Sequence, residues 1–229
     1  MRSSILFLTS LSFACAAVAA PAQRVEIAYE LSRNGAAIAE LVERLEHDGK
    51  TYRLAAQMKG KGLAALRGDA SRTSRGTISP EGLLPTEFED KRSGRDTARA
   101  RADWQAKTLT LHAKEGASEA KPLPPDLQDR LSFTYSFAFR PQGSAPVPLS
   151  ITDGKGVSTS VYEVAGRETL KTPAGEFESL RMARKKNNPE DRSSEIWLAT
   201  KLGLVPVRIL VVEKDGTRID QVATRVVAQ

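Results

Sequence analysis

The chain has 229 residues, of which 40% are hydrophobic and 27% charged, and its formal net charge is +6. This length suits one all-β sandwich or barrel with a substantial core, and the scattered positive charge favours solubility and some attraction to anionic surfaces. No basic helix interleaved with aromatic residues occurs, which argues against a nucleic-acid partner.

Residues 1–19 have the pattern of a secretory signal peptide. Arg2 supplies a short positive start, an apolar core follows, and residues 17–19 form the small Ala-Val-Ala cleavage site. The apolar core is too short to anchor the chain in a membrane, so the protein is not expected to span one. We expect cleavage after Ala19, with a cut after Ala22 as the alternative.

Residues 20–229 are then expected to form a single β-rich periplasmic domain. They carry a net charge of +5, because Arg2 is removed from the total of +6. The one cysteine, Cys15, lies in the removed segment, so the mature chain can form no disulfide. Lipidation of Cys15 is not expected, because Phe13 stands where a lipoprotein signal needs a small residue.

The mature chain is a succession of short alternating runs separated by turn dipeptides, which is typical of an antiparallel meander. Residues 25–31 alternate between large and mostly polar side chains, and Asn34-Gly35 then predicts a tight hairpin turn. Residues 36–47 are ambiguous, because their apolar side chains have helical spacing. We interpret them as a strand, since the flanking Asn34-Gly35 and Asp48-Gly49 turns join antiparallel strands.

Residues 60–68 carry three glycines after a strand, a pattern that sometimes cradles phosphate. The spacing fits neither the dinucleotide nor the P-loop fingerprint. We therefore expect a short helical turn that plugs one end of the sheet.

Small side chains form a row at Ala98, Ala100 and Ala102, where another element can pack closely. Packing against a helix is the favoured interpretation, and a ligand cavity is the alternative. The arginines between them, Arg99 and Arg101, belong to a basic strip that we interpret as a solvated strand face.

Residues 126–140 are the best candidate for a helix in a chain that otherwise has the pattern of strands. Two prolines precede Asp126, which suits an N-cap, and Asp129 falls in the first turn, where carboxylates favour helix formation. In such a helix Leu131 and Phe133 point to opposite sides, so both sides are apolar.

A helix of this kind has to be enclosed, and a curled sheet wrapped around it is the natural container. The expected fold is therefore mainly β: one antiparallel curled sheet, a half-barrel or open barrel, around one central helix (126–140). Residues 131–139 also alternate strictly between large and small side chains, so a half-buried strand stays the alternative.

The sequence contains no recognisable catalytic constellation. His47 and His112 lie in unrelated segments, which argues against catalysis or metal binding by histidine. The mature chain has no thiol, and no G-x-S-x-G elbow occurs. Glu87 and Glu89 share a strand face but show no pocket. We therefore expect a protein that is not an enzyme and holds no metal or cofactor.

Four segments carry a resemblance to a known family: residues 129–133 (DRLSF), 172–179 (TPAGEFES), 197–199 (WLA) and 204–209 (LVPVRI). In order and spacing they resemble domain of unknown function 3108, a family of exported bacterial proteins, from about Val25 onward. The last two segments also resemble the end of the LolA and LolB lipoprotein carriers. That likeness implies a curled half-barrel with an apolar cavity partly closed by helices, and no catalytic residues.

Two functional classes follow from these observations. The first is a non-catalytic periplasmic protein that binds an apolar ligand, a lipid or acyl chain, in the concavity of the curled sheet. The alternative is an envelope scaffold or protein-interaction module that binds a protein partner and no small ligand. The hypothetical ligand-binding residues are Phe133, Phe137, Tyr162 and Trp197.

The first testable prediction concerns export. The mature protein should begin at Ala20 and carry no lipid, because a short apolar core is followed by a small-residue cleavage site. Intact-mass spectrometry of the protein purified from the producing cell measures this directly. A species that retains residues 1–19, or one that starts at a diacylated Cys15, would contradict it.

Overall fold

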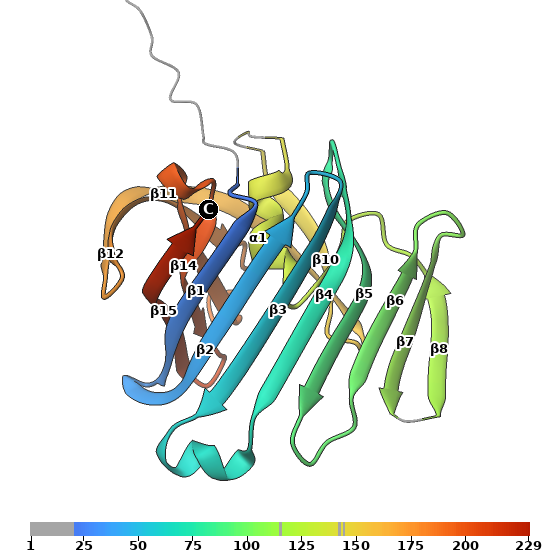
Figure 1. Ribbon diagram of the computed structural model, residues 1–229, viewed down its shortest axis with the longest axis horizontal. Coiled ribbons are helices and arrows are strands. Elements are labelled where there is room, and N and C mark those ends of the chain that lie inside the picture. Colours follow the sequence, from blue (N-terminus) through green and yellow to red (C-terminus); the bar gives the residue numbers. More distant parts are fainter. Residues whose placement is uncertain (1–20, 115, 142, 144) are drawn as a thin grey trace, which may run out of the picture.

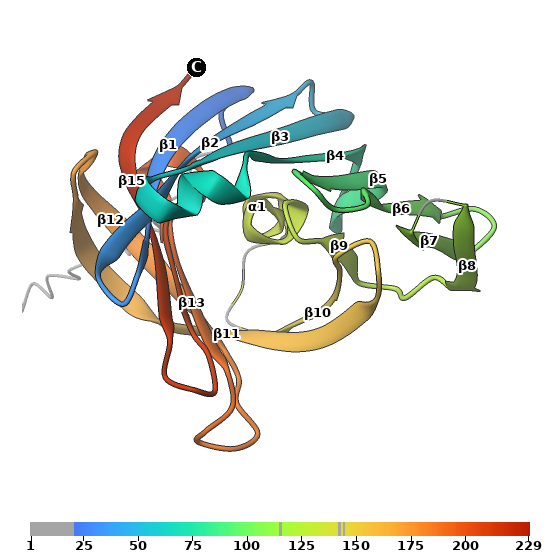
Figure 2. The ribbon, with the colours of Figure 1, turned by 90° about the horizontal axis from the view of Figure 1, so that it is seen from below.

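The computed structural model describes residues 21–114, 116–141, 143 and 145–229 (Figures 1 and 2). The expected signal peptide therefore lies outside the described residues. One sheet of fifteen strands curls around a single short α-helix without closing, as the sequence predicts. In the described part of the chain, no helix is long and apolar enough to cross a membrane.

The elements follow one another in the order β1 (Arg24–Arg33), β2 (Ala36–His47), β3 (Thr51–Gly60), η1 (Gly62–Arg67), β4 (Ala70–Ser79), β5 (Gly82–Arg92), β6 (Ala98–Asp103), β7 (Thr108–Lys114), β8 (Ala117–Pro122), β9 (Leu127–Asp129), α1 (Ser132–Phe139), β10 (Val147–Thr152), β11 (Val157–Thr172), β12 (Gly175–Arg184), β13 (Ser193–Ala199), η2 (Thr200–Leu202), β14 (Val205–Val212) and β15 (Arg218–Ala228).

The sheet consists of two antiparallel meanders that meet where the first strand pairs with the last, and the short β9 adds a parallel strand beside β10. Its spatial order runs from β8 back to β1, then from β15 back to β9. The strands β8 and β9 are consecutive in the chain yet form the two opposite edges. The connection between them brings β9 against the inner face of β5. There Gln128 on β9 donates a hydrogen bond of 2.8 Å from Nε2 to the carbonyl oxygen of Leu83 on β5. The sheet is thus a spiral whose inner edge is β9 (Figure 2).

The ambiguous residues 36–47 form strand β2, which confirms the interpretation based on the turns. Asn34 and Gly35 have φ angles of 50° and 83°, as a type I′ hairpin requires. Every second side chain from Ala39 to Leu45 is buried. The helical spacing was misleading because alternation of period two decides which side chains face the core.

The helix α1 lies inside the curl, but it is shorter than predicted. It spans Ser132–Phe139 rather than 126–140, because residues 127–129 pair with β10 as strand β9. The expected N-cap, Asp126, is therefore wrong. The N-cap residue is Leu131, which makes no side-chain cap hydrogen bond. Asp129, two residues earlier, supports the start of the helix: its Oδ1 accepts hydrogen bonds from the backbone N–H groups of Leu131 (2.9 Å) and Ser132 (2.8 Å).

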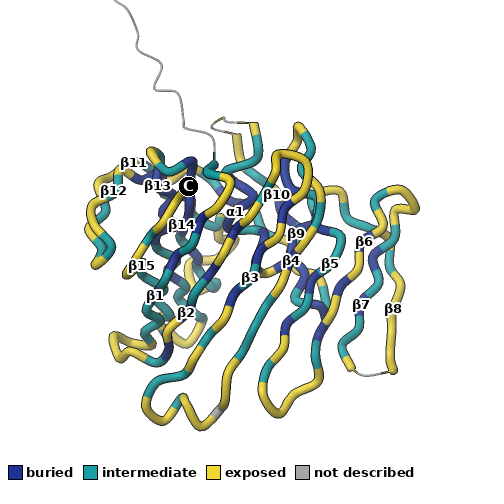
Figure 3. Tube along the Cα trace, in the orientation of Figure 1, coloured by how far each residue is buried: buried dark blue, intermediate teal, exposed yellow. Residues whose placement is uncertain are grey.

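Both sides of α1 face apolar side chains, as expected. Leu131 and Tyr135 belong to the larger cluster, which covers the inner face of β1 to β7 and also includes residues of β13 to β15, Trp197 among them. Phe137 belongs to a second cluster formed by β10 to β14, and the half-buried Phe133 packs against its edge. The helix is the layer that joins the two clusters, and burial in Figure 3 is concentrated around it.

Two smaller expectations are only partly correct. Residues 62–67 form the helical turn η1, but Leu63 and Leu66 are 86% and 85% exposed, so the turn does not plug the sheet. Ala98 is buried, yet the segment against it is the β10–β11 turn rather than α1. A Cβ atom added at Gly154 in that turn would lie 3.1 Å from the Cβ of Ala98.

The second prediction tests the position of α1. Leu131→Ala should lower the free energy of unfolding by about 2–5 kcal/mol, as is usual for a fully buried leucine. Leu63→Ala is the matched control and should change it by no more than about 0.5 kcal/mol, because Leu63 is exposed. Urea denaturation of the two variants gives both values. If both variants lose the same small free energy of unfolding, Leu131 does not lie in the core.

Candidate functional site

Inward-facing side chains form rows across the first meander, because residues directly opposite each other on antiparallel strands share a face. One row runs through Glu43, Ala56, Arg72, Asp90 and Ala98, on β2 to β6. All but Arg72 are buried, and the two alanines leave room for the longer charged side chains. The interior of the curl is therefore polar at this level.

Glu43 links this row to the helix. Its Oε2 accepts a hydrogen bond of 2.8 Å from the hydroxyl of Tyr135 on α1. Burial raises the pKa of the Glu43 carboxyl, while Tyr135 and the more distant Arg72 act in the opposite direction. The neighbouring Tyr29 donates its own hydroxyl to the carbonyl oxygen of Pro206 at 2.7 Å.

Asp129 is a second carboxylate inside the curl. Besides the two N–H groups at the start of α1, it accepts a hydrogen bond of 2.5 Å from the hydroxyl of Ser74 on β4. The Ser74 hydroxyl also contacts the Tyr52 hydroxyl at 3.0 Å. Burial raises the pKa of Asp129 despite these donors. Asp129 is 0% exposed and Glu43 6% exposed, so neither is accessible to a substrate. We interpret both as anchors of α1.

Three of the four predicted ligand-binding residues lie together beside α1. The ring centroid of Tyr162 on β11 lies 6.2 Å from that of Phe133 and 5.6 Å from that of Phe137. Phe137 and Tyr162 are buried, whereas Phe133 is half-buried. The partly buried side chains around the same cluster, which the sequence did not single out, are Val147, Ile151 and Ile209.

Trp197, the fourth predicted residue, lies elsewhere. Its neighbours Ile196 and Leu198 belong to the cluster of Phe137, and alternation along β13 turns Trp197 to the opposite face. Its indole N–H donates to Glu168 at 2.5 Å, and the guanidinium of Arg208 lies 4.7 Å from the ring centroid. The structure therefore does not bring Trp197 to the aromatic group of α1.

The inner face opens to solvent toward the end where η1 lies. Along β3 the inward side chains Tyr52, Leu54 and Ala56 are buried, whereas Met58 is half-buried. The same change occurs along β5 between the buried Asp90 and the half-buried Arg92. The interior is thus packed around α1 and accessible below it.

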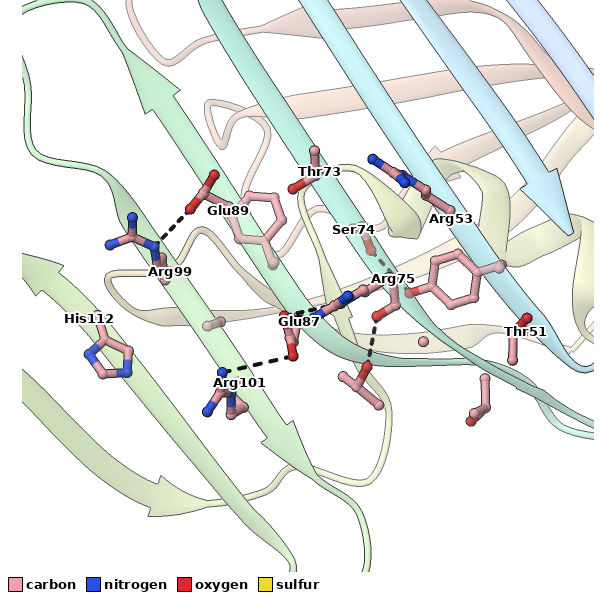
Figure 4. A pocket seen from close by; sticks show the side chains of 16 residues that line it. Thr51, Arg53, Thr73, Ser74, Arg75, Glu87, Glu89, Arg99, Arg101 and His112 are labelled. Carbon is pink, nitrogen blue, oxygen red and sulfur yellow. Dashed lines mark hydrogen bonds and ion pairs between the residues drawn. The ribbon is translucent and has the colours of Figure 1, made fainter.

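A hollow of about 920 Å³ lies on the outer face of the sheet (Figure 4). Cross-strand pairing sets Arg53, Arg75, Glu87 and Arg101 in one row. Glu87 contacts Arg75 at 2.6 Å and Arg101 at 3.8 Å, and Glu89 on the same strand pairs with Arg99 in a parallel row.

The arginine side chains that form these ion pairs are 51–73% exposed. Exposed pairs of this kind contribute about 0–1 kcal/mol each and are common on strand faces. Despite its size, we therefore interpret this hollow as a solvated face, as expected from the sequence. Among the described residues, no group of histidine, cysteine, aspartate and glutamate side chains could hold a metal ion.

Comparisons with known proteins agree with this fold. A family model described as "Protein of unknown function (DUF3108)" matches residues 26–223. A β-barrel-like protein of domain of unknown function DUF1849 from Brucella abortus is similar in structure, with a TM-score of 0.60 and 7% identity, covering 92% of this chain and 100% of that chain.

Two further solved structures have TM-scores of 0.40. One is an exported protein with a YmcC-like fold from Bacteroides fragilis, 14% identical, covering 91% of this chain and 98% of its own. The other is described as a lipoprotein from Parabacteroides distasonis. It is 10% identical, and the match covers 91% of this chain and 97% of that chain. A search of curated proteins gave no match.

The third prediction follows from the buried Glu43. The pKa of its carboxyl is raised in the folded state, so the unfolded state loses its proton first as the pH rises above about 4.5. The wild type should therefore lose stability, relative to Glu43→Gln, between that pH and the folded-state pKa. The loss should be about 1.4 kcal/mol for each unit by which the pKa is raised.

Urea denaturation of both proteins at pH 4 and pH 8 measures this difference. Glutamine keeps an acceptor for the Tyr135 hydroxyl but cannot ionise, so the other titrating groups cancel in the comparison. A difference between the two proteins that stays the same at both pH values would show that Glu43 is not desolvated.

Proposed function

The chain belongs to the DUF3108 family of unknown function, and we propose that this protein is a non-catalytic binding protein of the bacterial envelope. In this proposal an apolar ligand, a lipid or acyl chain, lies in the concavity of the curled sheet beside α1. The side chains that would contact it are Phe133, Phe137 and Tyr162. Residues 20–229 would act in the periplasm after export.

The observation that carries the proposal is the partial exposure of Phe133. A large aromatic side chain on a central helix is normally buried completely. Phe133 instead packs by one side against Tyr162, and the partly buried Ile151 and Ile209 belong to the same cluster. Partly exposed apolar side chains in a concavity are typical of ligand sites.

A protein partner is the second candidate, and strand β8 favours it. This strand forms one edge of the sheet, and all but one of its residues are exposed. An unprotected edge can accept a strand from another protein by backbone pairing. The envelope scaffold considered from the sequence would use this edge and would hold no lipid.

The fourth prediction separates the two candidates. Extraction of the purified mature protein with organic solvent, followed by mass spectrometry, should yield a bound lipid from the wild type. Phe133→Gln should lose most of it, because an amide replaces the apolar contact surface. Phe177→Gln is the matched control and should keep it, since Phe177 is also half-buried but packs against the other cluster.

Lipid bound equally by both variants would show that the ligand does not lie beside Phe133. If the wild type yields no lipid and does not take up an added fatty acid, the apolar-ligand proposal is wrong and the β8 edge becomes the preferred candidate.

A further inference from the structure

The turn η1 carries the two most exposed large hydrophobic side chains in the described part of the chain. Leu63 is 86% exposed and Leu66 85%, whereas no other large hydrophobic side chain there exceeds 37%. In a 3-10 helix, residues three apart lie above one another, so both leucines point the same way. Ala65 between them is exposed as well. Single exposed leucines are common, but adjacent apolar residues in solvent usually have a function.

Contacts with the sheet hold η1 in place. The backbone N–H of Lys61 donates to the carbonyl oxygen of Ile38 on β2 at 2.8 Å, and Lys61 Nζ lies 3.0 Å from the carboxylate of Glu40. A Cβ atom at Gly60 would lie 2.5 Å from the carbonyl oxygen of Ala64, so η1 folds closely onto the end of β3. The turn projects beyond the ends of β3 and β4, at the bottom of Figure 1. Its exposed leucines are therefore presented by a fixed turn.

The apolar surface extends from η1 to two neighbouring strands. Leu63 and Ala64 line a hollow of about 470 Å³ together with Ile38 on β2 and Ile219 on β15, both of them half-buried. The surface is thus wider than the two leucines alone.

Basic side chains predominate around this apolar surface. On the strand ends and turns that adjoin η1, the exposed basic side chains are Arg33, Lys59, Lys91, Arg95, Lys214 and Arg218, and the exposed acidic ones are Asp69, Asp96 and Asp215. An apolar projection within a basic surface is typical of proteins that bind an anionic membrane without crossing it. Protein interfaces are instead enriched in aromatic residues and depleted in lysine. No aromatic residue occurs in η1 or in these strand ends and turns.

The interior of the curl opens at this same end of the sheet. Met58, just before the end of β3, and Arg92, at the end of β5, are half-buried, while the inward side chains nearer α1 are buried. A membrane in contact with η1 would therefore lie beside the open end of the curl.

We infer that η1 docks this protein on an anionic phospholipid bilayer. Leu63 and Leu66 enter the bilayer interface, and the surrounding lysines and arginines lie against the lipid phosphates. Each basic residue near such a surface adds to the attraction, and salt weakens it. This docking surface goes beyond the proposed function, because it needs no ligand inside the curl.

Co-sedimentation of the mature protein with lipid vesicles tests this inference. One set of vesicles contains phosphatidylglycerol and phosphatidylethanolamine, and the other contains only the zwitterionic phosphatidylcholine. The wild type should bind the anionic vesicles at least about tenfold more tightly, since two basic residues at the surface are enough for such a difference.

Replacing both leucines, Leu63→Ser together with Leu66→Ser, should weaken binding to the anionic vesicles about tenfold or more. One buried leucine side chain alone accounts for a factor of about ten. Val227→Ser is the control and should change nothing. Val227 is also an exposed apolar side chain, but it lies at the opposite end of the sheet, where β15 pairs with the start of β1.

The possible failures are distinguishable. Equal binding by the wild type and the double leucine variant overturns the docking through η1. Equal binding of the wild type to both kinds of vesicle overturns the role of the basic surface. Binding to neither kind overturns the bilayer as the partner and leaves the proposed function to the lipid extraction. Phe133→Gln should bind vesicles like the wild type, because Phe133 lies inside the curl. Circular dichroism of each variant confirms that it is folded.

Discussion

The fold depends on two buried carboxylates that hold a short helix inside a curled sheet. Asp129 joins the start of α1 to Ser74, 55 residues earlier, and Glu43 joins the middle of α1 to β2 through Tyr135, 92 residues away. A buried polar group without a partner costs several kcal/mol, so both contacts favour one orientation of the helix. That orientation turns Phe133 and Phe137 toward β10 to β14.

The open spiral follows from the same arrangement. An eight-residue helix with apolar sides needs a sheet on both of them. The first meander, together with residues of β13 to β15, supplies one side, and β10 to β14 supply the other. Because β8 and β9 end as opposite edges, the sheet passes beyond α1 rather than closing on itself. The interior is packed around the helix and becomes polar and accessible below it, where Met58 and Arg92 are half-buried.

The sequence predicts the sheet, the central helix and the aromatic residues beside it, because these depend on local periodicity and turn chemistry. Asn34-Gly35 was a better guide to β2 than the spacing of its apolar side chains. The start of α1 could not be placed, because residues 127–129 pair with β10 as a strand and the helix begins only after them. Trp197 was grouped with Phe133 since the sequence does not reveal which face of β13 meets the helix.

The contact of Glu43 with Tyr135 was not singled out at all. The two residues are 92 positions apart in the sequence and meet only through the order of the strands. Contacts of this range cannot be deduced from spacing along one chain. The binding site is therefore less predictable than the fold that supports it.

The central claim is that the ligand lies inside the curl, against the half-buried Phe133 of α1, rather than on the outer face. Photo-crosslinking with a fatty acid that carries a diazirine at the end of its chain tests it most directly, with the labelled peptides identified by mass spectrometry. The account predicts labels within residues 132–139 and on β10 to β14. Labels confined to the outer face of β3 to β7, around Arg53 and Arg101, would contradict it.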